Sequence, residues 1–482
     1  MKFNLISVHL DKNNVVLFVS TALLLGFSYP PFPLGILAFI GLVPFLLLID
    51  RINSFWRFFR YSYATFFVFC IITLYWVGGF THRRDPYLML AGGALLLFQP
   101  LFFTLIGSVY YAIRKIVHSE YAVFTLPFIW VMFEWLYALG EFSFPWLTLG
   151  NTQTYQLLKL QITEITGVYG LSFWILLINA VIYFIIRRNI VFQFGINLKR
   201  TVWVSLLLVL LYILPDIYGV FAIKREYGGN QKLNIGIVQP NVDPWEKWEG
   251  ANSLSGRWDQ VKGYLSLIDS HRNDSIDMAV LPESAILMNL PNFQSEYRTY
   301  KKFVDSTKIG IVSGYAKVTY YEHGPIPVSA SKIHGTNIYY DSYNSILYTQ
   351  PGIFGSQSYS KMRLVPFAER IPYAESVPFL IEPLRWGVGI SNWGKGKDST
   401  IFYDIDQHTK FLAMVCYESI FPEFVGSFVK KGAEFLIFIT NDSWWGNTSG
   451  ARQHKQYAVL RAVENRRWVI QCQVCSVVGQ FG

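Results

Sequence analysis

The sequence predicts a multispan bundle of membrane α-helices followed by a separate α/β domain. Of the 482 residues, 52% are hydrophobic and only 15% are charged, whereas an average soluble domain has about 25% charged residues. The hydrophobic excess lies before residue 222. After that point, apolar runs of strand length alternate with helical stretches, which is typical of a sheet covered by helices. We therefore expect a transmembrane bundle over residues 1–222 and an α/β domain over residues 223–482.

The first 222 residues contain about seven apolar stretches, each a candidate transmembrane helix. A helix needs about 20 apolar residues to cross the bilayer core. The candidates lie near residues 14–28, 34–49, 61–80, 88–113, 121–139, 167–186 and 202–221. The first two are short and are separated by a proline-rich turn at 28–33, so they form either a tight hairpin or a re-entrant pair. Glu134, in the fifth stretch, is a functional candidate because a carboxylate is costly in lipid, unless it simply faces the interior of the bundle.

Basic residues in the short loops predict the orientation of the bundle, because Lys and Arg are enriched on the cytoplasmic side. They follow the second, fourth and sixth stretches: Arg51, Arg57, Arg60, Arg114, Lys115, Arg187, Arg188, Lys199 and Arg200. Arg83 and Arg84 are the pair that disagrees. Seven crossings place residues 223–482 outside the cytoplasm, on the periplasmic side of the inner membrane in a bacterium with two membranes. The aromatic loop 140–166 lies on the same side, either as an interfacial belt or as a lipid-contacting wall beneath the α/β domain.

The α/β domain is expected to alternate short strands with helices. Apolar runs predict strands at 233–238, 278–281, 309–312, 411–415, 435–440 and 468–471, and helices are expected at 254–270, 296–307 and 453–467. The runs at 337–340 and 344–349 flank Asp341-Ser-Tyr, which favours an antiparallel pair joined by a turn there. His454 is expected on the surface of the last helix.

Charge and cysteine content argue against several other classes of protein. The formal net charge is +9, but the basic residues do not form one patch, so a nucleic-acid partner is not expected. Four cysteines are too few for a disulfide scaffold. Cys472 and Cys475 form a C-x-x-C without a second pair, which argues against a zinc site and favours two small residues in a buried strand over redox chemistry. We expect neither a metal nor another cofactor.

Three residues after apolar runs or in a loop could together perform acyl transfer. Cys416 follows a strand-like run, Glu283 ends another, and Lys361 lies in a polar segment. A thiol is a strong nucleophile only as thiolate, and a neighbouring carboxylate can take its proton. The tetrahedral oxyanion that follows needs a positive donor, which a lysine supplies. Taken singly, each of these residues is more often structural than catalytic.

The local sequences strengthen the case, because Leu281-Pro-Glu-Ser284, the segment Tyr359–Glu369 and Val415-Cys-Tyr-Glu-Ser419 resemble motifs of the nitrilase superfamily. Members of that superfamily use a Glu-Lys-Cys triad, in this chain order, within an αββα sandwich. With the preceding bundle, nearly the whole chain resembles the apolipoprotein N-acyltransferase family. The resemblance implies that Glu283 activates Cys416, that Cys416 takes an acyl chain from a membrane phospholipid as a thioester, and that Lys361 stabilises the oxyanion.

The resemblance also implies the acceptor and several supporting residues. The acceptor is the α-amine of the S-diacylglyceryl cysteine at the N-terminus of a lipoprotein, so both substrates lie in the bilayer. Supporting residues are Glu369, Tyr417, Glu418 and Trp248, with Trp245 close enough to compete for the last role. The loop Asn441–Gly446 is either a second support for the thiolate or a turn with aromatic packing.

Other interpretations remain compatible with these residues. A membrane-tethered nitrilase-type amidase would resolve the thioester with water instead of a lipid amine. A transport or binding protein would use the α/β domain only to recognise ligands, although charges within the apolar stretches are scarce. Family members continue into more sandwich and a last transmembrane helix, which Gln471–Gly482 does not match, so a truncated C-terminus is expected. The sequence does not specify the phospholipid, the acyl length, the client lipoproteins or the oligomeric state.

Overall fold

The computed structural model describes residues 11–79, 85–117, 120–188, 198–225, 232–240, 247, 253–381, 392–472 and 476–478. The chain divides into two compact units. The first comprises Met1–Phe80, Met89–Leu136 and Leu147–Lys224, and the second comprises Thr81–Leu88, Tyr137–Trp146 and Arg225–Gly482. A short segment of the N-terminal half, Tyr137–Trp146, is therefore part of the second unit.

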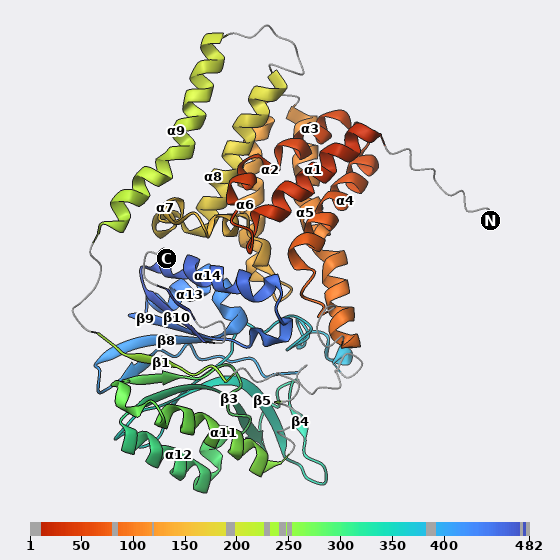
Figure 1. Cartoon of the computed structure of the whole chain (residues 1–482). Helices are drawn as coiled ribbons and strands as arrows, with labels where there is room; N and C mark the ends of the chain where they lie inside the picture. The colour runs from red at the N-terminus through yellow and green to blue at the C-terminus, as the bar shows by residue number, and fades with distance from the viewer. Residues whose placement is uncertain are drawn as a thin grey trace, which may run out of the picture. The chain divides into compact units, whose positions relative to one another are not determined.

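The first unit is helical. Its helices are α1 Lys12–Ser28, α2 Ala38–Gly41, α3 Val43–Arg51, α4 Phe55–Leu74, α5 Pro86–Val117, α6 Leu126–Leu139, α7 Leu157–Leu160, α8 Thr163–Ile186 and α9 Leu198–Ile223 (Figure 1). Within the described chain, four helical segments are long and apolar enough to cross a membrane: Leu88–Val117, Glu120–Leu139, Thr163–Ile186 and Val202–Ile223. These four match the last four predicted spans and show a membrane protein. The other three predicted spans are not in this set. The first, α1, is a shorter apolar helix. The second is divided into the short helices α2 and α3, and α4 carries Arg57 and Arg60 in its first two turns.

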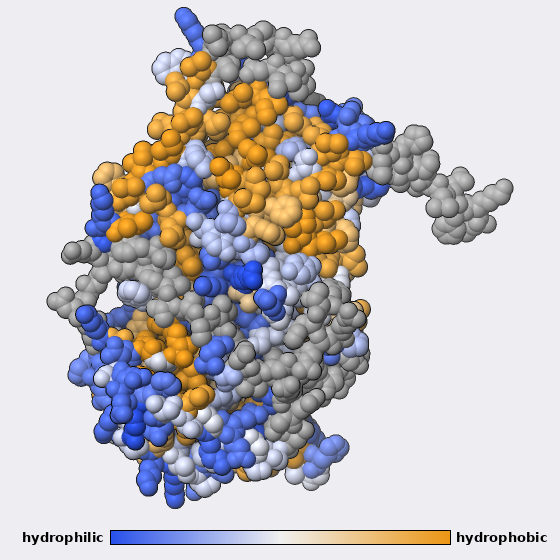
Figure 2. All heavy atoms as spheres, viewed as in Figure 1, coloured by the Kyte–Doolittle hydropathy of each residue, from blue (hydrophilic) through white to orange (hydrophobic). Residues whose placement is uncertain are grey.

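Glu134 is a buried acid inside the first unit, where burial away from water favours hydrogen-bonded polar groups. Glu134 is buried, and its Oε1 accepts hydrogen bonds from Trp130 Nε1 at 3.0 Å and from the backbone N–H of Leu149 at 2.8 Å. Of the two interpretations of this acid, the structure supports the one in which it faces the interior of the bundle. Apolar side chains in Figure 2 gather over this helical part of the chain.

The second unit contains two β-sheets between two layers of helices, the αββα order expected from the sequence. The first sheet has the strand order β1-β2-β3-β5-β4, with β6 also paired to β5, and the second has the order β11-β10-β9-β8-β7. The strands are β1 Ile235–Ile237, β2 Met278–Val280, β3 Gly310–Tyr321, β4 Ser331–Lys332, β5 Tyr339–Thr349, β6 Gln357–Ser360, β7 Phe402–Asp404, β8 Thr409–Val415, β9 Phe435–Ile439, β10 Trp468–Cys472 and β11 Ser476–Val478. The helices are α11 Leu254–Asp269, α12 Gln294–Thr307, α13 Pro422–Val429 and α14 Ser449–Asn465.

Apolar alternation explains why these layers form. Val261 and Leu265 of α11 and Val304 of α12 are buried against Ala279 and Ile311 of the first sheet. All five residues of β9 are buried, as expected for a strand covered on both faces (Figure 1). The sheets meet through aromatic side chains, and Tyr348 of β5 lies edge-to-face on Phe411 of β8 with ring centroids 5.0 Å apart. Parallel pairing of β8, β9 and β10 brings the ends of these strands to one edge.

The predicted turn at Asp341-Ser-Tyr is wrong. Residues 339–349 form one continuous strand, β5, which pairs antiparallel with β3 over eleven residue pairs from Ile311↔Thr349 to Tyr321↔Tyr339. The turn was predicted because Asp and Ser are common turn residues. Here Asp341 Oδ2 accepts a hydrogen bond from the hydroxyl of Ser329 at 2.8 Å, and the side chain is buried. A tertiary contact thus gives one oxygen of this buried carboxylate a hydrogen-bond donor inside a strand.

Candidate active site

Cys416 lies at the end of β8, where the chain leaves the sheet in a left-handed conformation. Strand β8 ends at Val415, and a 3-10 turn, η10 Cys416–Ile420, follows directly. The φ of Cys416 is 48°, which non-glycine residues adopt rarely and chiefly where the surrounding structure enforces it. The carbonyl oxygen of Cys416 accepts a hydrogen bond from the Ser419 hydroxyl at 2.7 Å. The strand and the turn therefore fix the position of a partly exposed thiol.

Glu283 lies just past β2, in a turn that packs tightly on the neighbouring strand. Its N–H donates to the carbonyl oxygen of Thr440 at 3.3 Å, and its own carbonyl oxygen accepts from Lys247 Nζ at 3.0 Å. Gly314 of β3 makes room for this turn, because a Cβ there would come within 2.4 Å of the Ser284 nitrogen and 2.8 Å of Glu283 Cα. Contacts from Thr440, Lys247 and Gly314 to the backbone of this turn therefore fix the direction of the Glu283 side chain.

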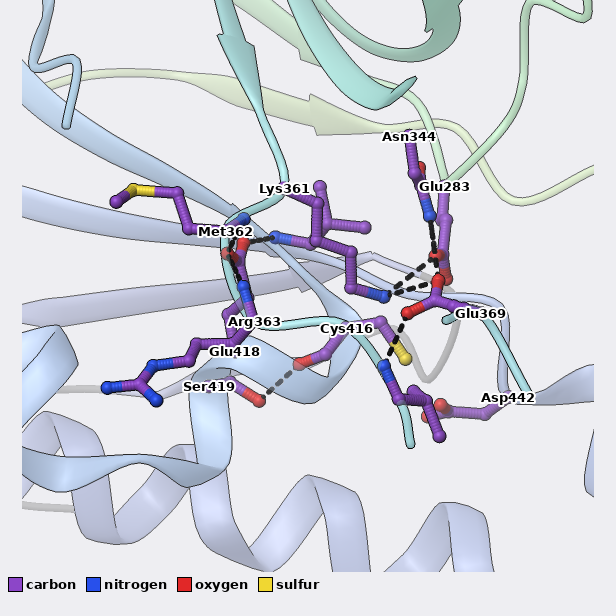
Figure 3. Close-up of polar contacts among 12 residues, drawn as sticks. Glu283, Asn344, Lys361, Met362, Arg363, Glu369, Cys416, Glu418, Ser419 and Asp442 are labelled. Atoms are coloured by element: carbon purple, nitrogen blue, oxygen red, sulfur yellow. Dashed lines mark hydrogen bonds and ion pairs between the residues drawn. The ribbon is translucent and has the colours of Figure 1, made fainter. Parts of the chain in front are cut away.

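Lys361 follows β6 and places its ammonium group between two carboxylates. Its Nζ is 2.8 Å from Glu369 Oε1 and 3.6 Å from Glu283 Oε1. Asn344, in the neighbouring strand β5, donates from Nδ2 to Glu283 Oε1 at 2.7 Å and to Glu369 Oε1 at 3.2 Å. All four side chains are buried. Figure 3 shows Cys416 extending toward this group of Lys361, Glu283 and Glu369, so the structure brings the three predicted catalytic residues together.

Burial and charge set the protonation of this group. Burial raises the pKa of Glu283, Lys361 opposes this shift, and the nearby Glu369 adds to it. Burial by itself would lower the pKa of Lys361, but the carboxylates of Glu369 and Glu283 outweigh it and raise that pKa. Burial also raises the pKa of the Cys416 thiol well above its usual range, with a further contribution from Glu283. These shifts favour the neutral thiol of Cys416, so a nucleophilic role for this residue would need a base that removes its proton.

Glu418 connects the turn that begins at Cys416, η10 Cys416–Ile420 (the nucleophile turn), to the loop that follows Lys361. Its Oε1 accepts hydrogen bonds from the Tyr359 hydroxyl at 2.6 Å and from the backbone N–H groups of Met362 and Arg363 at 2.7 and 3.1 Å. Its Oε2 accepts from the backbone N–H of Val415 at 3.0 Å. One fully buried carboxylate thus holds the residue before Cys416 and the two residues after Lys361 (Figure 3). Its contacts indicate a positioning role.

The segment Tyr137–Trp146 covers the nucleophile turn within the second unit. The hydroxyl of Tyr417 donates to the carbonyl oxygen of Ser143 at 2.6 Å, and its ring stacks on Phe144. Trp146 is buried, its Nε1 donates to Gln453 Oε1 at 2.7 Å, and its carbonyl oxygen accepts from the Tyr457 hydroxyl at 2.8 Å. This part of the aromatic loop is therefore built into the α/β unit, which neither interpretation of loop 140–166 anticipated.

A second polar cluster lies on the other side of Cys416. The ligand-type atoms of Cys416, Asp442 and His454 all lie within 4.8 Å of one another. His454 is fully buried on α14, so its predicted surface position is wrong. Its Nδ1 is 2.9 Å from Asp442 Oδ1 and its Nε2 is 2.8 Å from Ser419 Oγ. Both ring nitrogens are therefore within hydrogen-bond distance of an oxygen atom.

Several site residues escaped the sequence prediction and one predicted residue cannot be placed. Asn344, His454 and Ser419 gave no signal, because each is an ordinary polar residue within a strand, helix or turn. The loop Asn441–Gly446 was identified, and its Asp442 joins the cluster, which favours the supporting role for that loop over simple aromatic packing. Trp248 and its competitor Trp245 lie outside the described residues.

Comparisons with known proteins agree with this geometry. Residues 234–480 match the Carbon-nitrogen hydrolase family, so the second unit is a domain of the nitrilase superfamily. Residues 21–181 match the Apolipoprotein N-acyltransferase N-terminal domain. The chain belongs to the apolipoprotein N-acyltransferase family, as the sequence motifs predicted.

Two relatives, from Chlorobaculum tepidum and Geobacter metallireducens, support the same assignment. An apolipoprotein N-acyltransferase of Chlorobaculum tepidum is 34% identical over 468 residues, which cover 94% of this chain and 83% of the relative. One of Geobacter metallireducens is 29% identical over 459 residues, which cover 95% of this chain and 83% of the relative. Among solved structures, an amidase from Nesterenkonia sp. is 13% identical with a TM-score of 0.31, and the match covers 53% of this chain and 85% of that one.

Proposed function

We propose that this membrane N-acyltransferase uses Glu283, Lys361 and Cys416 as a catalytic triad that transfers an acyl chain from a phospholipid to a lipoprotein amine. The observation that carries the proposal is the placement of the buried Lys361 ammonium 2.8 Å from Glu369 and 3.6 Å from Glu283, beside Cys416. A buried cation with donors free to reorient toward an oxyanion provides the electrostatic stabilisation that acyl transfer needs.

In the first half-reaction, the Glu283 carboxylate takes the thiol proton while Cys416 Sγ attacks the carbonyl carbon of a phospholipid ester. The oxyanion of the tetrahedral intermediate is stabilised by Lys361. Collapse of the intermediate breaks the ester C–O bond, and the lysophospholipid oxygen leaves with the proton held by Glu283. The enzyme then carries a thioester on Cys416, and Glu283 is a carboxylate again.

In the second half-reaction, the α-amine of a diacylated lipoprotein attacks the thioester carbon. Glu283 takes a proton from the attacking nitrogen, and Lys361 again stabilises the oxyanion. The C–S bond breaks as the proton returns to sulfur, which gives the amide and the free thiol. Glu369 keeps Lys361 charged in both steps, while Tyr417 and Glu418 hold the nucleophile turn.

We further propose that the α/β unit faces the periplasm, which rests on the distribution of Lys and Arg in the loops of the first half. Both substrates are lipids, so an active site attached to a membrane-spanning chain meets them at the bilayer surface. The match to the family's N-terminal domain over residues 21–181 supports this arrangement.

The test is incubation of the purified full chain with phospholipid and a synthetic diacylated lipopeptide, followed by mass spectrometry of protein and peptide. The proposal expects an acyl-sized mass gain on wild-type protein that is chased onto the lipopeptide amine and is missing in Cys416→Ser. Decay of the acyl-enzyme to free fatty acid alone would instead indicate a membrane-tethered hydrolase. Undiminished transfer by Cys416→Ser would refute the assigned nucleophile.

A further inference from the structure

A chain of polar contacts begins at the Cys416 backbone and ends near its thiol. The Ser419 hydroxyl donates to the Cys416 carbonyl oxygen at 2.7 Å, and Ser419 Oγ also lies 2.8 Å from His454 Nε2. His454 Nδ1 lies 2.9 Å from Asp442 Oδ1. A carboxylate oxygen of Asp442 is within 4.8 Å of Cys416 Sγ. Ser419, Asp442 and His454 are buried.

One arrangement of protons satisfies every contact of this cluster. In it, the Ser419 hydroxyl donates to the Cys416 carbonyl oxygen, which can only accept, and Ser419 Oγ accepts from His454 Nε2–H. His454 Nδ1–H donates to Asp442 Oδ1. In this arrangement the pair is an imidazolium beside a carboxylate, with a net charge of zero.

Two indole rings pack beside His454. The ring of His454 lies 5.5 Å from Trp146 and 6.0 Å from Trp445, centroid to centroid, and both ring pairs are tilted. The charged groups that act on Cys416 are Glu283, Lys361, Glu369 and Asp442. Three of these four are acids, so an uncompensated Asp442 would add to the charge that disfavours the thiolate.

We propose that His454 is a positioning residue for the nucleophile: it neutralises Asp442 beside Cys416 and, through Ser419, holds the carbonyl of the left-handed turn. The inference rests on the proposed role of Cys416. It assigns His454 and Asp442 to the reactivity of the thiol, and it gives them no contact with substrate.

The expected size of the effect follows from Coulomb's law. A full negative charge within 4.8 Å of the sulfur, at an effective dielectric constant of about 20, lowers the thiolate population by at least on the order of a hundredfold. Loss of the imidazole in His454→Gln exposes Cys416 to that charge. Removal of the charge as well, in His454→Gln with Asp442→Asn, restores most of the reactivity although the ring is still missing.

The experiment measures alkylation of Cys416 by iodoacetamide in the full chain in detergent, with peptide mass spectrometry to separate Cys416 from the other three cysteines, Cys70, Cys472 and Cys475. We expect His454→Gln to slow alkylation by roughly a hundredfold and the double variant to recover at least tenfold of that loss. The exposed His271→Gln serves as the matched control for the same chemical change.

Two results would overturn the inference. Alkylation of Cys416 at the wild-type rate in His454→Gln would show that the imidazole does not affect the reactivity of the thiol. A double variant as slow as His454→Gln would show that the loss comes from damaged packing, since both proteins lack the same ring. Alkylation needs no lipid substrate, so these outcomes are independent of whether acyl transfer itself is detected.

Discussion

Glu418→Gln is the most informative single change, because it removes a charge and one acceptor while it preserves shape. In the best orientation, the amide oxygen still faces the hydroxyl of Tyr359 and the N–H groups of Met362 and Arg363. The amide nitrogen then replaces the oxygen that is 3.0 Å from the Val415 nitrogen. Two donors meet there, and the N–H of Val415 is left buried without an acceptor.

The cost can be estimated from these contacts. A buried donor without a partner costs about 1–3 kcal/mol, and hydrogen bonds to a charged acceptor are worth about 1 kcal/mol more than neutral ones. Relief of the burial penalty that raises the pKa of Glu418 offsets part of this. We expect a net loss of about 2–4 kcal/mol, which at roughly 2–4 °C per kcal/mol lowers the apparent Tm by about 5–10 °C.

The rate of acyl-enzyme formation should fall even where the variant is fully folded, because Val415 directly precedes Cys416. A small shift of this backbone moves the nucleophile out of line with the ester carbon, and such misplacement costs on the order of a hundredfold in rate. The assay is the rate of acyl-enzyme formation at temperatures well below the Tm of the variant. The exposed Glu322→Gln is the control. An unchanged Tm together with an unchanged rate would refute the positioning role of Glu418.

Three further predictions concern the triad and its support. Acyl transfer should slow as the pH falls, and the acidic limb of the pH–rate profile should have an apparent pKa above the ordinary glutamate pKa of about 4.3. The reason is that burial raises the pKa of Glu283 and that protonated Glu283 cannot accept the thiol proton. An acidic limb at the ordinary glutamate pKa would contradict this. Asn344→Asp replaces the donor shared by Glu283 and Glu369 with a third acid, and single-turnover acylation should slow by about a hundredfold or more; an unaffected rate would show that the amide is dispensable. Gly314→Ala places a Cβ 2.4 Å from the Ser284 nitrogen and should lower kcat at least tenfold by shifting Glu283, whereas a wild-type kcat would mean that the turn relaxes freely.

The sequence predicted those parts of the molecule that depend on local pattern. Continuous apolar runs predicted the strand that leads to Cys416 and the strand before Glu283, and family motifs predicted Lys361 and Glu369. Helices over 254–270 and 296–307 are confirmed within a residue or two of α11 and α12. These features depend on neighbouring residues or on the order of motifs along the chain, both of which a sequence displays directly.

Features that depend on distant contacts could not be predicted in the same way. Asp341 looks like a turn residue until Ser329 is seen beside it, and His454 looks like a surface residue until Ser419 and Asp442 are seen around it. In both cases a partner from another segment satisfies the polar group and makes burial acceptable. Asn344 acquires its role only when β5 is placed next to the turn that carries Glu283.

The assignment of Tyr137–Trp146 to the second unit has a consequence for biosynthesis. Ribosomes make these ten residues before any of the chain from Arg225 onward, at the end of a helix long and apolar enough for membrane insertion. The residues from Arg225 onward do not by themselves contain Ser143 and Trp146, which pack on Tyr417 and His454. A proteolytic fragment that begins at Arg225 would lack Ser143 and Trp146, and with them the contacts to Tyr417, Gln453 and Tyr457. Cleavage at that point would therefore remove packing from the α/β unit as well as its connection to the helical unit.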